Sequence, residues 1–92
     1  MAKHTNEQVI TRFLNGLEAS GNSLHTNGDS LYSYGLEIAR WYGGKPIVFD
    51  YTSTGNAFKS MTTSQHVGLI KREVPIQRVM LVEFARSIGI IK

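Results

Sequence analysis

Two tight-turn signals, Asn27-Gly28 and Gly43-Gly44, constrain the fold of this chain more than any other feature. Both pairs favour two-residue turns between neighbouring antiparallel strands. From Leu24 onward, the residues around these turns alternate with a period of two, which is typical of strands. A polar turn over residues 53–56 closes this region. The pattern predicts a small antiparallel β-meander of three to four strands.

The longest strand of this meander is expected over Leu31–Tyr42, because the segment is rich in Tyr, Ile and Trp. Gly35 lies in its middle and predicts a bulge or a close approach of the backbone. A returning strand follows Gly43-Gly44. Each strand places apolar and aromatic side chains on one face, namely Tyr32, Tyr34, Leu36 and Ile38 on the first and Ile47, Phe49 and Tyr51 on the second.

A helix is expected before the meander. Thr5 and Gln8 have the spacing of a capping box, in which each side chain satisfies a free backbone amide of the first turn. Gly21 and Asn22 are expected to end this helix. Its apolar stripe consists of Val9, Ile10, Phe13, Leu14 and Leu17.

A second helix is expected to begin within Ser60–Val67, with Thr62 as its N-cap and Gln65 three residues later. It would carry Val67, Ile70 and Val74 toward the core and end on Lys71-Arg72, and Pro75 breaks the chain after it. The free amides of its first turn and the positive end of its dipole could instead hold a phosphate or a carboxylate. The sequence leaves both interpretations open.

The last segment, Ile76–Ile88, is ambiguous. Met80, Phe84 and Ile88 have helical spacing, whereas Val79–Val82 would equally suit a buried strand. Its length favours a helix. The whole pattern predicts one α+β domain over residues 1–92, in which an N-terminal helix and two C-terminal helices cover one face of the meander.

Composition limits the class of protein. A length of 92 residues suits one domain, and 41% hydrophobic with 18% charged residues is a globular balance. Because the chain has no cysteine, it has no disulfide, no thiolate metal site and no cysteine nucleophile. No signal peptide or membrane-spanning run is visible, so we expect a cytoplasmic protein.

The net charge of +3 is unevenly distributed. Residues 1–55 carry four basic and five acidic side chains, whereas residues 56–92 carry six basic and two acidic ones. A basic C-terminal half could face an acidic partner such as nucleic acid, although such charges also commonly just solvate helices. The candidates for a basic binding face are Lys59, Lys71, Arg72, Arg78 and Arg86.

The hydroxyl-rich start of the second helix is a candidate site of chemistry. His66 with Ser64 and Asp50 has the residue types of a nucleophile triad, but the strand–turn–helix elbow of the Gly-x-Ser-x-Gly type is missing. Catalysis is therefore not expected, and this segment is predicted to act in binding only. The candidate binding residues here are Thr62, Thr63, Ser64 and His66.

Metal and cofactor sites are not expected either. The three histidines, His4, His25 and His66, lack the paired spacing of a zinc site, and no acidic cluster resembles a magnesium or calcium loop. Gly43-Gly44-Lys45 lacks the earlier glycine and the following Ser or Thr of a phosphate-binding loop.

Aromatic side chains gather in the strand region and offer a further possibility. Exposed aromatics on a sheet can stack nucleic-acid bases, whereas helices packed on the sheet would bury them. Burial is the favoured interpretation, since aromatics are common in strands for packing reasons alone. The residues concerned are Tyr32, Tyr34, Trp41, Tyr42 and Tyr51.

Two segments carry a resemblance to known proteins. Ser30–Ala39, followed by Thr62–His66, resembles a pattern in small uncharacterised phage-encoded proteins, which couple an L-Y-S-Y-G-x-x-I-A strand to a T-T-S-x-H helix start. The resemblance spans roughly residues 30–71 and implies a viral origin. Small phage proteins without catalytic motifs often dock on host machinery, as anti-CRISPR proteins do, and this is an analogy of role.

We therefore expect a non-catalytic phage accessory protein that binds a host protein or nucleoprotein complex and inhibits a defence nucleoprotein. The alternative is a small RNA- or DNA-binding domain that uses the basic C-terminal half and the sheet aromatics. Neither function requires a cofactor or a membrane.

Overall fold

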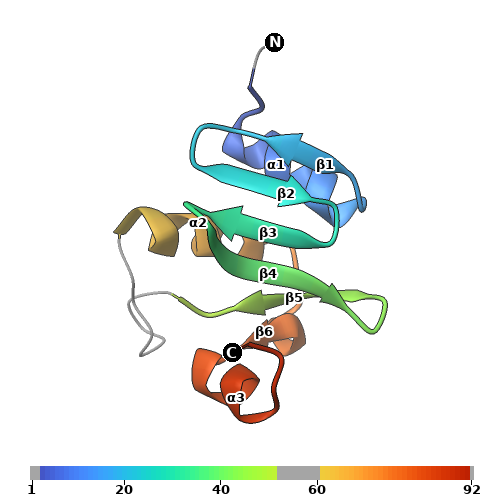
Figure 1. Ribbon diagram of the computed structural model, residues 1–92, viewed down its shortest axis with the longest axis vertical. Helices are drawn as coiled ribbons and strands as arrows, with labels where there is room; N and C mark the ends of the chain where they lie inside the picture. The colour runs from blue at the N-terminus through green and yellow to red at the C-terminus, as the bar shows by residue number, and fades with distance from the viewer. Residues whose placement is uncertain (1–2, 52–60, 92) are drawn as a thin grey trace.

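The computed structural model describes residues 3–51 and 61–91, which form one mixed sheet with helices packed around it (Figure 1). The α+β class expected from the sequence is confirmed. In chain order the elements are α1 (Asn6–Leu14), β1 (Glu18–Ser20), β2 (Leu24–Asn27), β3 (Ser30–Ser33), β4 (Leu36–Tyr42), β5 (Lys45–Phe49), α2 (Met61–Lys71), the 3₁₀ turn η1 (Ile76–Arg78), β6 (Val79–Met80) and α3 (Val82–Ser87).

The strands follow one another in the sheet in the order β1-β2-β3-β4-β5-β6. Successive pairs from β1 to β5 are antiparallel, as the meander predicted, but β6 pairs with β5 in parallel. The expected number of three to four strands was too low. The described residues contain six, because Glu18–Ser20 and Val79–Met80 are short strands and Leu31–Tyr42 is not continuous.

The break in Leu31–Tyr42 is a two-residue turn at Tyr34-Gly35. Both residues have positive φ, 51° for Tyr34 and 85° for Gly35, so they form a tight hairpin turn and not the expected bulge. An irregularity in register does occur, but at the Leu31/Tyr32 step of the β3–β4 pairing. Tyrosine seldom adopts positive φ, which is why the sequence did not signal a turn here.

The first helix begins as expected, since Thr5 and Gln8 exchange the two hydrogen bonds of a capping box. It ends at Leu14 and not at Gly21. Gly16 has φ of 72°, its N–H bonds the Phe13 carbonyl, and the next N–H bonds the Arg12 carbonyl. This is a Schellman ending, and it leaves Leu17 beyond the helix and 48% exposed.

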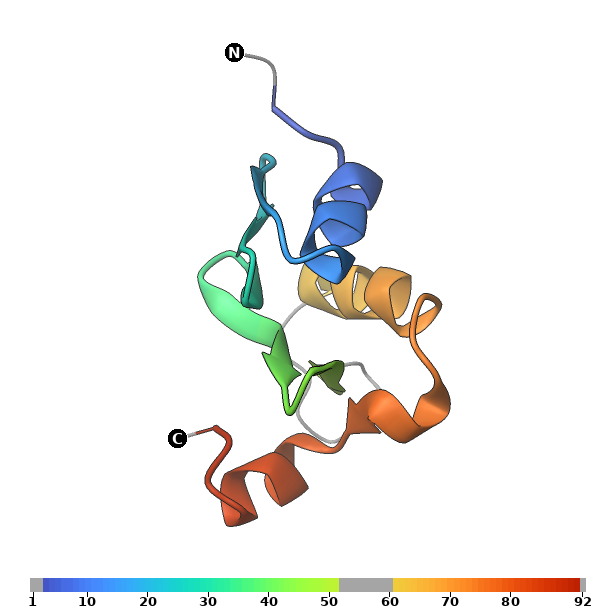
Figure 2. The same ribbon diagram turned by 90° about the vertical axis from the view of Figure 1, so that its right-hand side faces the viewer.

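Helices lie on both sides of the sheet, contrary to the expectation that all would cover one face (Figure 2). On one side α1 and α2 pack together, and Trp41 reaches α1 by donating from Nε1 to the Phe13 carbonyl at 2.8 Å. On the other side the chain after α3 returns to the sheet, where Arg40 donates to the Ile90 carbonyl at 2.8 Å. The core between these layers consists mainly of Val9, Phe13, Leu24, Leu31, Ile38, Ala39, Val48, Phe49, Val67, Ile70, Val82 and Ala85.

The second helix begins at Met61, so Thr62 lies inside its first turn and the expected N-cap at Thr62 is wrong. The expected burial of Val67 and Ile70 is confirmed, while Val74 lies beyond the helix and is only half-buried. The polar turn expected over residues 53–56 lies outside the described residues.

The continuous helix expected over Ile76–Ile88 is also wrong. The segment divides into η1, β6 and α3, so part of the strand alternative was right. Val79 and Met80 pair with Val48 and Phe49, and the Met80 carbonyl accepts from the Asp50 N–H at 2.9 Å. Pairing with β5 over these two residues interrupts the helical spacing.

Candidate functional site

The hydroxyl-rich start of α2 leads to a group of side chains that we call the His66 cluster, made of the buried Ser33, Thr63 and His66 and the half-buried Ser23. The Ser33 Oγ lies 2.7 Å from Nδ1 of His66, and the Ser23 Oγ lies 3.3 Å from Nε2. The Ser33 and Thr63 hydroxyls are 3.2 Å apart. Both ring nitrogens of the histidine therefore have hydroxyl partners contributed by other elements.

Local structure explains how these side chains meet. Thr63 and His66 are three residues apart on α2 and so project from the same side of the helix toward the sheet. Ser33 ends β3 opposite Leu24, and the Tyr34 N–H bonds the Ser23 carbonyl at 2.9 Å, which holds the two loops together. The Tyr34 ring lies over the cluster, 6.1 Å from the His66 ring.

Burial decides what this cluster can do. His66 is 3% exposed and Ser33 is fully buried. Desolvation lowers the pKa of His66 from its usual value, which keeps the imidazole neutral at neutral pH. A neutral imidazole has one donor and one acceptor nitrogen, and the two serine hydroxyls can serve both. Ser33 has no solvent access and so cannot attack a substrate, and the contacts of Ser33 and of the half-buried Ser23 with His66 join α2 to the sheet region.

The triad considered from the sequence is not assembled among the described residues. Ser64 stands two positions from His66 on α2, so their side chains leave the helix in different directions. Asp50 contacts Lys71 instead, with 3.5 Å between Oδ1 and Nζ. The serines that do reach His66 come from the sheet region, and no sequence spacing could have identified them.

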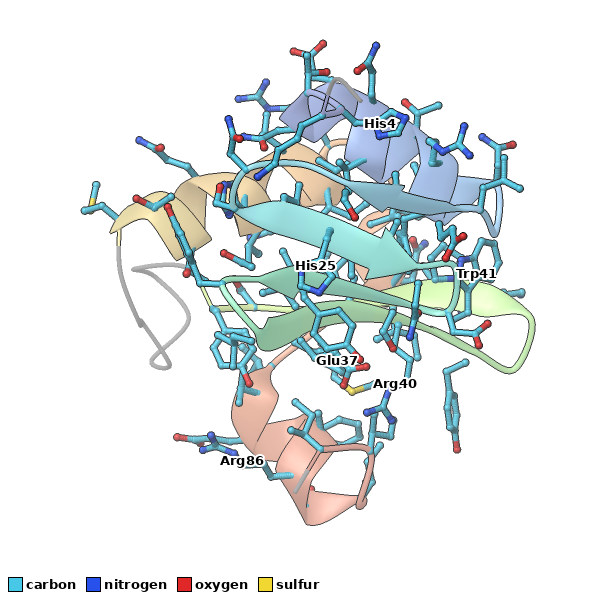
Figure 3. All side chains as sticks on the ribbon, turned by 45° about the horizontal axis from the view of Figure 1, so that its top comes forward. His4, His25, Glu37, Arg40, Trp41 and Arg86 are labelled. Carbon is cyan, nitrogen blue, oxygen red and sulfur yellow. The ribbon has the colours of Figure 1, made fainter. Side chains whose placement is uncertain are left out.

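The basic candidates occupy several elements. Lys71 pairs with Asp50 at the end of α2, and Arg72 lies in a hollow beside Glu7 and Glu73 where α1 meets α2. Arg78 is half-buried in η1. Arg86 lies on α3, away from the α1–α2 layer (Figure 3), and Lys59 lies outside the described residues. A single basic face that includes Lys59 therefore stays a prediction.

The remaining candidates on α2 divide between surface and interior. Thr62 and Ser64 are half-buried, whereas Thr63 and His66 are buried. The structure thus brings Thr63 and His66 together, but in the interior, where they are not available to a partner.

The sheet aromatics also divide. Tyr51 is 2% exposed, and its burial raises the pKa of the phenol although Arg86 nearby opposes that shift. Trp41 is held by its bond to α1. Tyr32 stacks on His25 with 5.0 Å between ring centroids, whereas Tyr34 and Tyr42 remain mostly exposed at hairpin turns. The expected burial applies to Tyr51 and, in part, to Trp41 and Tyr32.

The face of the sheet away from α1 and α2 is polar. His25, Glu37 and Arg40 all point outward from it (Figure 3). Arg40 donates to both carboxylate oxygens of Glu37, which raises the pKa of the guanidinium further, and its Cζ lies 5.9 Å above the Phe49 ring. The central cation of this face is therefore already paired with a carboxylate.

An apolar area on the C-terminal segment was not anticipated. We call it the C-terminal apolar surface and define it by Ile76, Leu81, Phe84 and Ile88, each more than half exposed. A groove of about 330 Å³ next to it is lined by Gln77, Val79, Met80, Leu81 and Phe84. From the sequence, Phe84 and Ile88 were noted only for their helical spacing. The signal that was missed is a second set of apolar residues in α3, Val82 and Ala85, and these are the residues that are buried.

Comparison with protein families, with curated proteins and with solved structures finds no match to this chain. None of the helices in the described ranges is long and apolar enough to span a membrane. Within residues 3–51 and 61–91, no group of three or more His, Asp or Glu side chains could hold a metal ion.

Proposed function

We propose that this chain is a non-catalytic binding protein that docks on a partner protein through the C-terminal apolar surface. The observation that carries the proposal is the exposure of Leu81 and Phe84 beside an apolar groove, at 58% and 54%. Leu81 and Phe84 line the same groove, and exposed apolar side chains that lie together commonly mark protein–protein contacts. Aromatic and large aliphatic side chains of this kind can anchor in a pocket of a partner and contribute most of the binding energy.

The distribution of polar groups supports binding over catalysis. In the His66 cluster, His66 and Ser33 are buried, Ser23 is half-buried, and both serine hydroxyls lie within hydrogen-bond distance of the ring nitrogens. The cations support direct nucleic-acid binding less well, because Lys71 and Arg40 are paired with carboxylates and Arg72 lies beside two others. The exposed rings of Tyr34 and Tyr42 are what favour the nucleic-acid alternative.

The resemblance to phage-encoded proteins extends this proposal. The partner would be a host protein or nucleoprotein complex in the host cytoplasm, and docking would inhibit it at a fixed ratio, in the manner of an anti-CRISPR protein. A defence nucleoprotein is the target class that this analogy favours.

The proposal can be tested by capturing host proteins on the immobilised chain and quantifying them by mass spectrometry. A variant carrying Leu81→Asp and Phe84→Asp should lose the specific partner by at least about tenfold, since each anchor commonly contributes more than 1 kcal/mol. Leu17→Asp is the matched control, because Leu17 is also an exposed leucine but lies beside α1, and it should capture normally.

The salt dependence of partner capture distinguishes protein docking from nucleic-acid binding. An apolar interface should persist when the salt concentration is raised, whereas phosphate contacts weaken steeply. If capture falls with salt and with the double reversal Lys71→Glu and Arg72→Glu, but survives the α3 substitutions, the nucleic-acid alternative replaces this proposal.

A further inference from the structure

Another hollow lies at the end of the molecule opposite the C-terminal apolar surface, between the start of α1 and the outer edge of β1. Its volume is about 420 Å³, which is within the range of small-molecule sites. His4 marks its position beside α1 (Figure 3). It is lined by Lys3, His4, Arg12, Glu18, Ala19, Ser20 and Thr26.

Two hydrogen bonds hold the backbone of His4 and the side chain of Arg12 against the edge of β1. The His4 N–H donates to the Ser20 carbonyl at 2.9 Å, and Nε of Arg12 donates to the Glu18 carbonyl at 2.8 Å. Anchoring through Nε sets the plane of the guanidinium and leaves its two terminal nitrogens without a partner in the described part of the chain. Arg12 thus presents a pre-oriented fork of donors, which suits a carboxylate or phosphate.

The charge of the hollow is not cancelled locally. Neither Lys3 nor Arg12 forms an ion pair within residues 3–51 and 61–91. Glu18 is the one acidic residue that lines the hollow, and neither Lys3 nor Arg12 is paired with it among the described residues. The hollow is therefore bordered by two cations, Lys3 and Arg12, that form no ion pair among the described residues, together with the imidazole of His4 and the single acidic residue Glu18.

We propose that this hollow binds a phosphate group through Lys3, His4 and Arg12. A phosphate is tetrahedral and carries up to two charges, so it can accept from donors on three sides, whereas a carboxylate offers only one plane of acceptors. Inorganic phosphate and a phosphorylated small molecule share this chemistry. The size of the hollow leaves room for an organic group beside Ala19 and Thr26.

The test is a titration of the isotope-labelled full chain, followed by amide NMR. The probes are inorganic phosphate, a nucleoside monophosphate and the same nucleoside without phosphate. We expect saturable shifts confined to residues 3–12 and 18–20 with both phosphate probes and none with the bare nucleoside. A larger affinity for the monophosphate would identify an organic phosphate as the preferred source.

Charge-matched variants decide whether the site is specific. Lys3→Gln and Arg12→Gln should each weaken binding by about tenfold, as expected for loss of a charged hydrogen bond. Lys45→Gln removes the same charge at the exposed β4–β5 turn and should not affect binding. Because Lys3 makes no contact that the fold requires, its variant tests the proposal even if Arg12→Gln loosens β1. Equal effects of Lys3→Gln and Lys45→Gln, or shifts that never saturate, would overturn the proposal.

Discussion

At the scale of single residues, His66 connects sequence and structure most closely. Its position in a hydroxyl-rich segment suggested a site, yet its two partners on the sheet side, Ser23 and Ser33, lie far from it in the sequence. A buried neutral histidine with both nitrogens bonded stabilises the fold only while it stays neutral. This requirement makes the protein sensitive to acid.

The first prediction concerns pH. Because burial lowers the folded-state pKa of His66 below its unfolded value of about 6.5, the unfolded state binds the proton more readily. The stabilisation is thus complete above about pH 6.5 and is lost as pH falls through the folded pKa. Urea midpoints measured between about pH 8 and about pH 5 should fall more steeply for the natural chain than for His66→Gln. Parallel curves for the two proteins would show that His66 does not titrate this way.

The second prediction concerns Ser33. Its replacement by Ala removes the 2.7 Å partner of Nδ1 and leaves a buried polar atom unsatisfied, so unfolding should become easier by about 1–3 kcal/mol. Ser87→Ala is the control, because Ser87 is exposed and bonds only the Phe84 carbonyl of its own helix. It should change the free energy of unfolding by less than about 0.5 kcal/mol. Similar losses in both variants would contradict a structural role for the cluster.

At the scale of elements, the sequence was informative wherever a local signal dictates the backbone. The capping box at Thr5 formed as predicted. The hairpin turn at Gly43-Gly44 also formed as predicted, and both of its glycines have positive φ. The predicted elements were wrong where contacts with distant parts of the chain determine the backbone conformation. Tyr34 adopts positive φ, and its backbone N–H bonds the Ser23 carbonyl. Val79–Met80 form a strand only because β5 lies next to them.

Alanine substitutions at two glycines should change the free energy of unfolding in opposite directions. Gly16 ends α1 at φ of 72° and Gly68 lies inside α2, and a Cβ at either position would meet no atom within 4 Å. Gly16→Ala should therefore lower the free energy of unfolding by about 1 kcal/mol through backbone strain alone. Gly68→Ala should raise it by about 0.5–1 kcal/mol, because alanine favours the helix. Denaturant unfolding of both variants checks this, and shifts of the same sign would contradict the assigned backbone conformations.

At the scale of the whole molecule, the fold class followed from the sequence but the surfaces did not. Alternation and turn signals predicted a sheet with helices, and they carried no information on which apolar face of α3 would be buried. The buried face of α3 is set by the packing of Val82 and Ala85 against the rest of the core, which leaves Leu81 and Phe84 exposed. The basic hollow by β1 was equally hidden, because it forms only when α1 ends at Leu14 and the chain returns as β1.

The central claim is that a partner covers the C-terminal apolar surface, and side-chain footprinting of the captured complex tests it directly. Hydroxyl-radical labelling, quantified by mass spectrometry, compares each side chain in the free and bound chain. We expect strong protection of Leu81 and Phe84, with unchanged labelling of Tyr42, an equally exposed aromatic at the β4–β5 turn. Protection of Tyr34 and Tyr42 with α3 labelled as in the free protein would contradict the claim.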